Sequence, residues 1–293
     1  MEFMEQLLKD LNARRDRARL LMFSCLILYI PALVLLFKGN AAAGAAASVL
    51  GFGVYLFVAK REEKRYAAAV AEANALRGVA APLENAEYAA RSEMFAKDSL
   101  PVHVSPADAE RISKPLCCHA VAGTYDSRAV ELCEMTFGYQ YADKKSAWRF
   151  FSGTAARLAL APREGDEALL LSPNLFDGSF TAVDYEKKGW HKVTCPSWSM
   201  KQDGTLFTRG EGEPSPEWLK ALAEDFRAVH GTNGLCALYV GRDTAEVFLR
   251  SRFYAQSAKV AMKPDEAMIT SNGFAARDAL LALAQRLSAE AKA

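Results

Sequence analysis

The tightest cluster of side chains that could do chemistry is Cys117, Cys118 and His119, followed by Asp126. Cysteine and histidine are the usual zinc ligands, and a Cys and a His within hydrogen-bond reach can form a nucleophilic pair. Leu116 to Ala122 is an expected β-strand, in which neighbouring side chains point to opposite faces. Cys117 and Cys118 therefore cannot readily share a metal, and we expect core thiols.

The other histidines are expected to have structural roles. His191 and Cys195 are four residues apart on an expected strand, so they share a face but lie more than about 10 Å apart, too far for a catalytic pair. His230 falls in the last turn of an expected helix, where a partial positive charge suits the helix dipole. His103, between two prolines, is expected in a surface loop.

Other reactive patterns are incomplete. The stretch GEGEP at 210–214 lacks the Lys and Ser or Thr of a phosphate-binding loop. FSGTA at 151–155 lacks the second glycine of a serine-hydrolase elbow. Glu131 and Glu134 have opposite strand parity, so they are not an acid–base pair on one face. We therefore predict no catalytic, metal-binding or cofactor-binding residue, and no cofactor.

Large aromatic side chains are better candidates for binding. Most are expected in the core, because large aromatics dominate protein cores, while one or two at a sheet edge could form a partner or ligand surface. They are Trp148, Phe150, Phe151, Trp190, Trp198 and Phe207.

Two uncharged runs near the N-terminus organise the rest of the chain. Leu20 to Phe37 has 18 residues, which as a helix rise about 27 Å, close to the roughly 30 Å apolar core of a bilayer. A second uncharged run, Ala41 to Ala59, follows after three residues. We predict two membrane-spanning helices, about 20–37 and 41–59, joined by a tight turn.

Small residues in the second run favour close helix packing in lipid. Gly44 with Ser48 and Ala47 with Gly51 are each four residues apart, which suits packing against the first run or self-association. Neither run contains Asp, Glu, Lys, Arg or His, so the usual mark of an ion or proton path is missing. A channel or pump is not expected.

Basic residues flank the outer ends of the two runs, whereas the turn has only Lys38. This bias predicts that both termini are cytoplasmic. A basic start before an apolar run also describes a signal peptide, but the second run close behind argues against cleavage. The flanking residues are Arg14, Arg15, Arg17, Arg19, Lys60, Arg61, Lys64 and Arg65.

Charge limits the function of the remaining chain. The 293 residues carry net +1, and Met1 to Arg65 has ten Lys and Arg against six Asp and Glu, so Tyr66 onward is −3. A mildly acidic domain lacks the basic patch of a nucleic-acid-binding protein. The basic residues beside the membrane are expected to contact anionic lipid head groups. The six cysteines are irregularly spaced, so no disulfide is expected.

Helical patterns surround the two runs. Met1 to Arg19 has apolar residues at helical spacing and is expected either to lie on the membrane surface or to extend the first span. The second run should continue as a charged helical stalk to about Gly78. Short helices are expected at Leu83 to Phe95 and from Ser105 to about Ser113.

From Leu116 the pattern changes to the alternation of strands. The clearest strand is VELCEMTFGYQYA at 130–142, with Cys133 and Met135 on one face, and it is expected to pair with Leu116 to Ala122. The other expected strand pairs are 157–161 with 167–171, 180–185 with 191–195, and 235–240 with 246–252, beside a weaker strand at 205–209.

Two amphipathic helices complete the soluble part, from Pro216 to about Gly231 and from about Ala275. Because short turns join the strands, we predict an α+β fold: an N-terminal transmembrane helical hairpin, a helical stalk, and a mostly antiparallel sheet with packed helices. The expected domains are the amphipathic helix and two-helix anchor at 1–65, a membrane-proximal helical segment at 66–115, and a cytoplasmic α+β domain at 116–293.

Four stretches carry a resemblance to a known family: Ser92–Phe95, Gly123–Thr136, Phe151–Gly153 and Thr205–Tyr254. In these stretches and in the order of its elements, the chain resembles a bacterial family of uncharacterised membrane proteins with two N-terminal transmembrane helices and a cytoplasmic α+β domain. The resemblance covers most of the chain and implies no known catalytic residue.

These patterns predict a non-enzymatic binding or scaffolding module at the inner face of a bacterial membrane. The expected partners are the lipid bilayer and a protein partner or a second copy, with no nucleic acid. One alternative is a membrane-surface enzyme whose site is assembled from residues distant in sequence. Another is membrane remodelling by the amphipathic start and the hairpin.

Overall fold

The computed structural model divides the chain into two compact units. The first comprises Met1–Gly78 and Gln256–Asn272, and the second comprises Val79–Ala255 and Gly273–Ala293. The described residues are 2–95, 115–140, 147–162, 165–172, 189–194, 204–210, 214–250, 260–261, 263–270 and 274–290.

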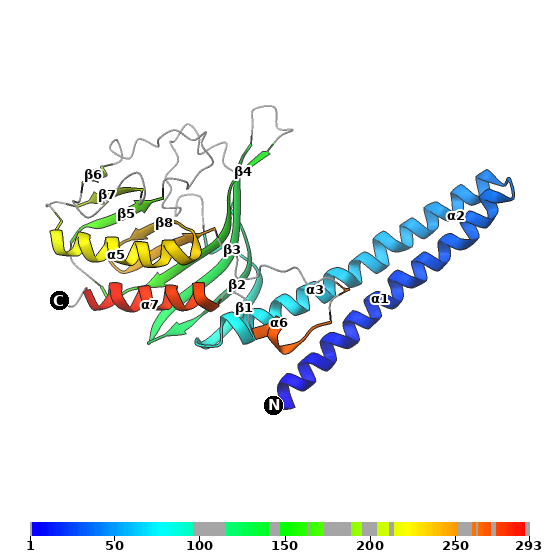
Figure 1. Cartoon of the computed structure of the whole chain (residues 1–293), viewed down its shortest axis with the longest axis horizontal. Coiled ribbons are helices and arrows are strands. Elements are labelled where there is room, and N and C mark those ends of the chain that lie inside the picture. The colour runs from blue at the N-terminus through cyan, green and yellow to red at the C-terminus, as the bar shows by residue number, and fades with distance from the viewer. Residues whose placement is uncertain are drawn as a thin grey trace. The chain divides into compact units, whose positions relative to one another are not determined.

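Two long antiparallel helices form most of the first unit (Figure 1). Helix α1 (Glu2–Phe37) is continuous, and the chain returns through α2 (Ala41–Val54), a π-helical turn η1 (Tyr55–Ala59) and α3 (Lys60–Asn74). A second π-helical turn, η2 (Ala75–Val79), follows α3. The predicted helical hairpin is therefore confirmed, and the amphipathic start extends the first apolar helix.

The turn between α1 and α2 has the local chemistry that a tight connection needs. Gly39 has φ +80°, a conformation that glycine adopts without the strain of a Cβ atom. The Asn40 side-chain oxygen accepts a hydrogen bond from the Ala43 N–H at 3.2 Å and caps α2.

Buried residues, most of them small, recur every seven positions along both helices. A seven-residue repeat lets two helices supercoil around each other. The one step of eight, from Gly51 to Ala59, contains η1, and a π-helical turn accommodates an extra residue. One face of each helix therefore stays turned toward its partner. The series is Leu11, Ala18, Cys25 and Ala32 on α1, and Gly44, Gly51, Ala59, Tyr66 and Ala73 on the returning helix.

Gly44 shows how closely the helices approach. A Cβ atom at this position would lie 2.5 Å from Leu36 Cγ and 3.2 Å from the Ala32 carbonyl oxygen, both on α1. Small residues permit such close approach where lipid gives no hydrophobic force between helices. The predicted packing of the second run against the first is confirmed at Gly44.

The pair continues beyond the apolar runs as a packed stalk. Leu11 and Tyr66 share a buried cluster with Ile269 of the short helix α6 (Glu266–Thr270), which the sequence patterns did not predict. The Asn74 side-chain amide donates a hydrogen bond to the Ile269 carbonyl oxygen at 2.8 Å. This contact fixes α6 against the end of α3.

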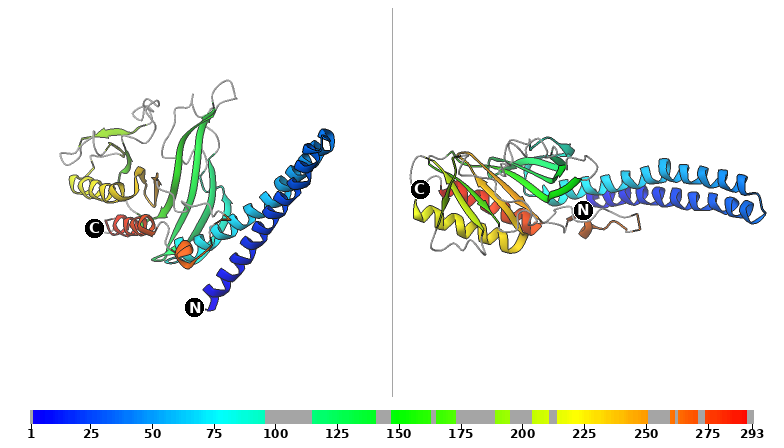
Figure 2. Two further views of the ribbon diagram at one scale, coloured as in Figure 1. Left: turned by 45° about the vertical axis from the view of Figure 1, so that its right-hand side comes forward. Right: turned by 90° about the horizontal axis from the view of Figure 1, so that it is seen from above.

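The second unit is an antiparallel sheet with two long helices (Figures 1 and 2). In the described part of the chain, nine strands run in the order β1-β2-β3-β4-β9-β8-β5-β7-β6. The predicted α+β fold is therefore confirmed. The elements are β1 (Glu84–Ser92), β2 (Leu116–Tyr125), β3 (Arg128–Gln140), β4 (Ala147–Ala159), β5 (Glu167–Leu171), β6 (His191–Val193), β7 (Thr205–Arg209), α5 (Pro216–Asn233), β8 (Leu235–Val240), β9 (Thr244–Leu249) and α7 (Phe274–Glu290).

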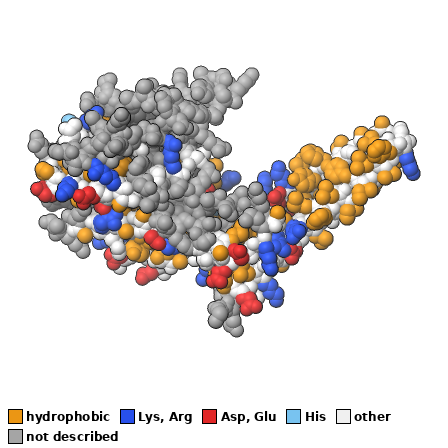
Figure 3. Space-filling view, viewed as in Figure 1, with side chains coloured by type: hydrophobic (Ala, Val, Ile, Leu, Met, Phe, Trp, Pro, Cys, Tyr) orange, Lys and Arg blue, Asp and Glu red, His pale blue; other side chains and the backbone are white. Residues whose placement is uncertain are grey.

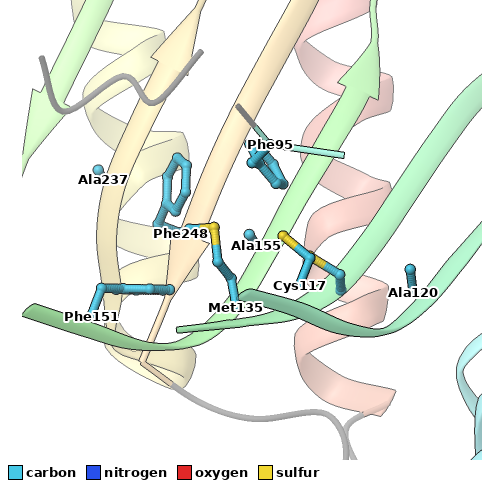
Figure 4. Close-up of a cluster of buried hydrophobic side chains, with 9 residues drawn as sticks. Phe95, Cys117, Ala120, Met135, Phe151, Ala155, Ala237 and Phe248 are labelled. Carbon is cyan, nitrogen blue, oxygen red and sulfur yellow. The ribbon is translucent and has the colours of Figure 1, made fainter. Parts of the chain in front are cut away.

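The two faces of the sheet differ. Helix α5 packs on β8 and α7 packs on β4, and an ion pair between the buried Asp225 and the exposed Arg286 joins the two helices. Figure 4 shows these helices on one side of the strands and a cluster of buried side chains on the other. That cluster comprises Phe95, Cys117, Ala120, Cys133, Met135, Phe151, Ala155, Ala237 and Phe248.

Two predictions about the second unit are wrong. The segment Leu83 to Phe95 is not a helix, because pairing of Glu84–Ser92 with β2 overrides the helix propensity of its alanines. The segments 157–161 and 167–171 contain strands that do not pair with each other. Instead β4 pairs with β3 and β9, and β5 pairs with β7 and β8.

The remaining strand predictions have mixed outcomes. The hairpins β2–β3 and β8–β9 and the strand β7 are confirmed, as are the helices from Pro216 and near Ala275. The residues 191–193 form β6, which pairs with β7. The expected helix at 105–113 and strand at 180–185 lie outside the described residues.

Gly44→Leu is expected to destabilise the helix pair by about 1–3 kcal/mol, because a larger side chain forces α1 and α2 apart. Gly53→Leu is the matched control, since a Cβ atom there has no other atom within 4 Å. The measurement is the free energy of unfolding in mixed detergent micelles. Energy transfer between dyes on α1 and α3 reports the separation of the helices. Equal losses of stability in the two variants would contradict this packing.

Candidate functional site

A band of exposed apolar side chains covers the half of the helix pair that ends at the turn between α1 and α2 (Figure 3). Apart from Leu116, all exposed large hydrophobic residues of the described chain belong to this band. Folded proteins rarely leave so continuous an apolar surface in water. Its members are Leu20, Phe23, Leu26, Ile27, Ile30, Leu33, Val34, Leu36 and Phe37 on α1, and Val49, Leu50, Phe52, Val54, Leu56, Phe57 and Val58 on the returning helix.

Both helices are long and apolar enough to cross a membrane. The candidate spans lie within Met4–Phe37, of 34 residues, and Ala41–Val79, of 39 residues. Only 12% and 11% of their most apolar windows are buried inside the protein. The core helix of a water-soluble protein would be mostly buried, so the apolar band is the surface that a bilayer would cover.

The second candidate site is a row of polar side chains on the sheet face opposite α5 and α7. We call Glu131, Arg157, Glu246 and Tyr239 the charged row, because they are direct cross-strand neighbours on β3, β4, β9 and β8. Arg157 donates hydrogen bonds to Glu246 Oε1 from Nε at 3.2 Å and from Nη2 at 3.0 Å. Its Nη1 lies 3.7 Å from Glu131 Oε2.

A second arginine repeats this arrangement further along the sheet. Arg209 on β7 pairs with Glu167 on β5, with Nε at 3.0 Å from Oε2. Its guanidinium lies 4.8 Å from the ring centre of Trp190, just as that of Arg157 lies 4.9 Å from the Phe95 ring centre. Each arginine therefore joins an ion pair to a cation–π contact.

Burial is the main cause of the pKa shifts of Glu246 and Tyr239 on this face. The pKa of Glu246 is raised by burial, which the hydrogen bonds and charge of Arg157 oppose. Burial and then the nearby Glu167 carboxylate raise the pKa of Tyr239 to about 12. The Glu246 carboxylate, held by two guanidinium N–H groups, links β9 to β4.

The prediction that Cys117 and Cys118 are core thiols is confirmed for Cys117 and is wrong for Cys118. Cys117 and Cys133 are both buried in the cluster of Figure 4, whereas Cys118 is half-buried, as expected for neighbours on opposite faces of β2. A hydrogen bond with Cys133 lowers the pKa of Cys117 to about 7 and raises that of Cys133. Cys117 is 1% exposed, so it is a core thiol.

His119 is displaced from the regular strand. It has φ +52° in a bulge of β2, and the Tyr88 hydroxyl lies 2.8 Å from its Nδ1 atom. Burial lowers its pKa, which favours the neutral ring. Within the described ranges, no three His, Cys, Asp or Glu side chains are grouped as a metal site.

The remaining predicted residues are not brought together. His191 is exposed on β6, His230 lies in α5, and Phe151 is in the buried cluster. Trp190 is 1% exposed and packs with Leu169. Trp148 and Phe150 lie in β4 and Phe207 in β7, while Asp126 is exposed in the turn between β2 and β3. His103, Cys195 and Trp198 lie outside the described residues.

Sequence reasoning missed the charged row. Arg157 and Glu246 are 89 residues apart, and neither belongs to a recognisable motif. The available signal was one charged residue directly before a short apolar run in each of two strands, RLALA at 157–161 and EVFL at 246–249. Such residues mark buried pairs but do not indicate which strands are neighbours.

Comparisons with known proteins add little to this description. No family model matches the chain, and no curated protein matches it. Membership of the bacterial family suggested above therefore stays a prediction. Among solved structures, the chain is similar to the mycobacterial trehalose monomycolate transport factor A, TtfA, with 8% identity and a TM-score of 0.35. The match covers 74% of this chain and 96% of that chain.

Arg157→Met is expected to lower the free energy of unfolding by about 2–3 kcal/mol, because it leaves the buried Glu246 carboxylate without its cation. Arg157 is 31% exposed, so the loss is smaller than for a fully buried pair. The double variant Arg157→Met/Glu246→Leu should recover part of the loss, since no uncompensated charge remains there.

The measurement is guanidinium-induced unfolding of the full chain in mild detergent, followed by tryptophan fluorescence. Arg128→Met is the matched control, because its partner Asp126 is 62% exposed and stays hydrated, so the expected loss is below about 1 kcal/mol. Arg157 does not compensate the buried Glu246 charge if Arg157→Met lowers the free energy of unfolding no more than this control does. The same conclusion follows if the losses from Arg157→Met and Glu246→Leu simply add in the double variant.

Proposed function

We propose that this chain is a membrane-anchored module that holds its sheet unit at the cytoplasmic face of the inner membrane as a binding or scaffolding surface. The helix pair crosses the bilayer as a hairpin, and both termini remain in the cytoplasm. The observation that carries this proposal is that, within the described part of the chain, the exposed large hydrophobic residues other than Leu116 form one continuous band on the helix pair.

Charge at the two ends of the band supports the orientation. The turn beyond Phe37 offers only Lys38, whereas eight Lys and Arg flank the opposite ends of the two runs. Basic residues in short segments beside a span are retained on the cytoplasmic side. This asymmetry favours a hairpin whose turn faces away from the cytoplasm.

The described sheet face favours binding over catalysis. Its arginines and carboxylates are engaged with one another and with aromatic rings, which gives a rigid surface without a converging reactive group. Rigid sheets with fixed side chains suit recognition of a partner.

Lys38→Cys is expected to react with a membrane-impermeant maleimide in intact spheroplasts, because the turn faces away from the cytoplasm. The wild-type chain is the control: its cysteines should not react in intact spheroplasts, since they lie within the membrane or on its cytoplasmic side. Mass-tag labelling of the full chain makes the measurement. Labelling of the wild type in intact spheroplasts, or no labelling of Lys38→Cys, would contradict the topology.

The binding role predicts a stoichiometric partner that remains on the full chain after purification in mild detergent and washing. Gly153→Val is the control that distinguishes a partner bound to the sheet unit from one bound to the helix pair. A Cβ atom at Gly153 would lie 2.0 Å from the Leu249 carbonyl oxygen, so the sheet is disrupted while the helix pair is unchanged. Quantitative mass spectrometry should find the partner on the wild type and not on the variant.

Two results would count against this role. A partner retained equally by Gly153→Val would bind the helix pair and not the sheet. A wild-type chain that carries a tightly held small molecule and no protein partner would favour the membrane-surface enzyme.

A further inference from the structure

A group of basic side chains at one end of the apolar band outnumbers the acidic side chains beside it. We call Arg14, Arg19, Lys60, Arg61 and Lys64 the basic collar. All five are exposed, and among the described residues they have no ion pair. Figure 3 shows Lys and Arg side chains gathered at this end of the band.

Two of the three acids in residues 14–19 and 60–65 are already paired within the helix pair. Glu62 lies 3.6 Å from Arg17 of α1 and also pairs with Arg65, and Asp16 pairs with Arg15. Because the contact from Arg17 to Glu62 crosses between helices, the basic residues of α1 and α3 lie at one level. Residues 14–19 and 60–65 together hold eight basic and three acidic side chains, a net charge of +5.

The collar begins where the apolar band ends. Leu20, one residue beyond Arg19, is 67% exposed, and Phe57, three residues before Lys60, is 78% exposed. Lys and Arg at such a boundary extend their methylene stems along apolar surface and place their charges at head-group level. The other end of the band has only Lys38.

We propose that the basic collar binds the head groups of anionic phospholipids on the cytoplasmic leaflet. This inference rests on the proposed membrane anchor and adds the class of lipid it selects. The collar supplies several N–H donors and unpaired positive charge at the depth of the lipid phosphates, and an anionic head group supplies the missing negative charge.

The test is native mass spectrometry of the full chain with equimolar phosphatidylglycerol and phosphatidylcholine of identical acyl chains. The collar variant is Arg19→Gln/Lys60→Gln/Lys64→Gln. The matched control is Arg242→Gln/Lys192→Gln/Lys220→Gln, which removes the same charges from exposed positions of the sheet unit. We expect the wild type to bind phosphatidylglycerol preferentially. In the collar variant the ratio of bound phosphatidylglycerol to bound phosphatidylcholine should fall about tenfold or more. In the control variant this ratio should stay within about twofold of the wild-type value.

Two outcomes would overturn the inference: equal binding of the two lipids by the wild type, or equal losses in the collar and control variants. Extraction of the wild-type chain from native membranes by alkaline carbonate separates this failure from failure of the anchor itself. A chain that stays in the membrane but shows no lipid preference removes only the collar proposal. A chain that is released removes the anchor as well.

Discussion

The close approach of α1 to the returning helix is the constraint on which the first unit depends. Gly44 has no room for a Cβ atom against Leu36 and Ala32, so the two backbones pack directly on each other. The seven-residue series keeps this contact along the pair, and η1 absorbs the one residue by which α2 and α3 would otherwise fall out of step. Because small residues occupy the inner face, the large apolar side chains are left on the outer surface. The same packing therefore creates both the hairpin and its apolar band.

A different balance holds the second unit together. On the sheet face opposite α5 and α7, Arg157 lies between two carboxylates and against an aromatic ring. A buried charge is tolerable only where its partner is fixed, so the Glu246 carboxylate ties β9 to β4 in one register. Trp190 and Phe95 each cover one side of an arginine. The result is a rigid sheet face on the unit that we propose binds a partner.

Sequence reasoning recovered the features that depend on local pattern. The apolar runs, the turn at Gly39, the alternation around Cys133 and Met135, and the hairpin β8–β9 all follow from composition or from periods of 3.6 and two. It failed where neighbours in space decide the outcome. The alanines of Glu84–Ser92 favour a helix, but β2 offers a strand partner whose paired residues lie 25 to 40 positions further along the chain. The pairing of β4 with β9 and of β5 with β8 likewise depends on contacts that no local signal encodes.

The candidate sites show the same division. The apolar band was predictable because every one of its residues lies in two short uncharged runs. The charged row was not, since it is assembled from four strands between Glu131 and Glu246. The basic collar lies between these cases. Its residues are evident in the sequence, but which of them are unpaired depends on the contact of Glu62 with Arg17 and Arg65.

Photo-crosslinking to lipid tests the central claim most directly. The photoreactive phenylalanine analogue benzoylphenylalanine would replace Phe23 and Phe57, which are 58% and 78% exposed on the band, and Leu116, which is 53% exposed on the sheet unit. The full chain would be reconstituted in bilayers, illuminated and analysed by mass spectrometry. Our account predicts abundant lipid adducts at positions 23 and 57 and few at position 116. Adducts no more frequent on the helix pair than at position 116 would contradict a membrane-embedded hairpin.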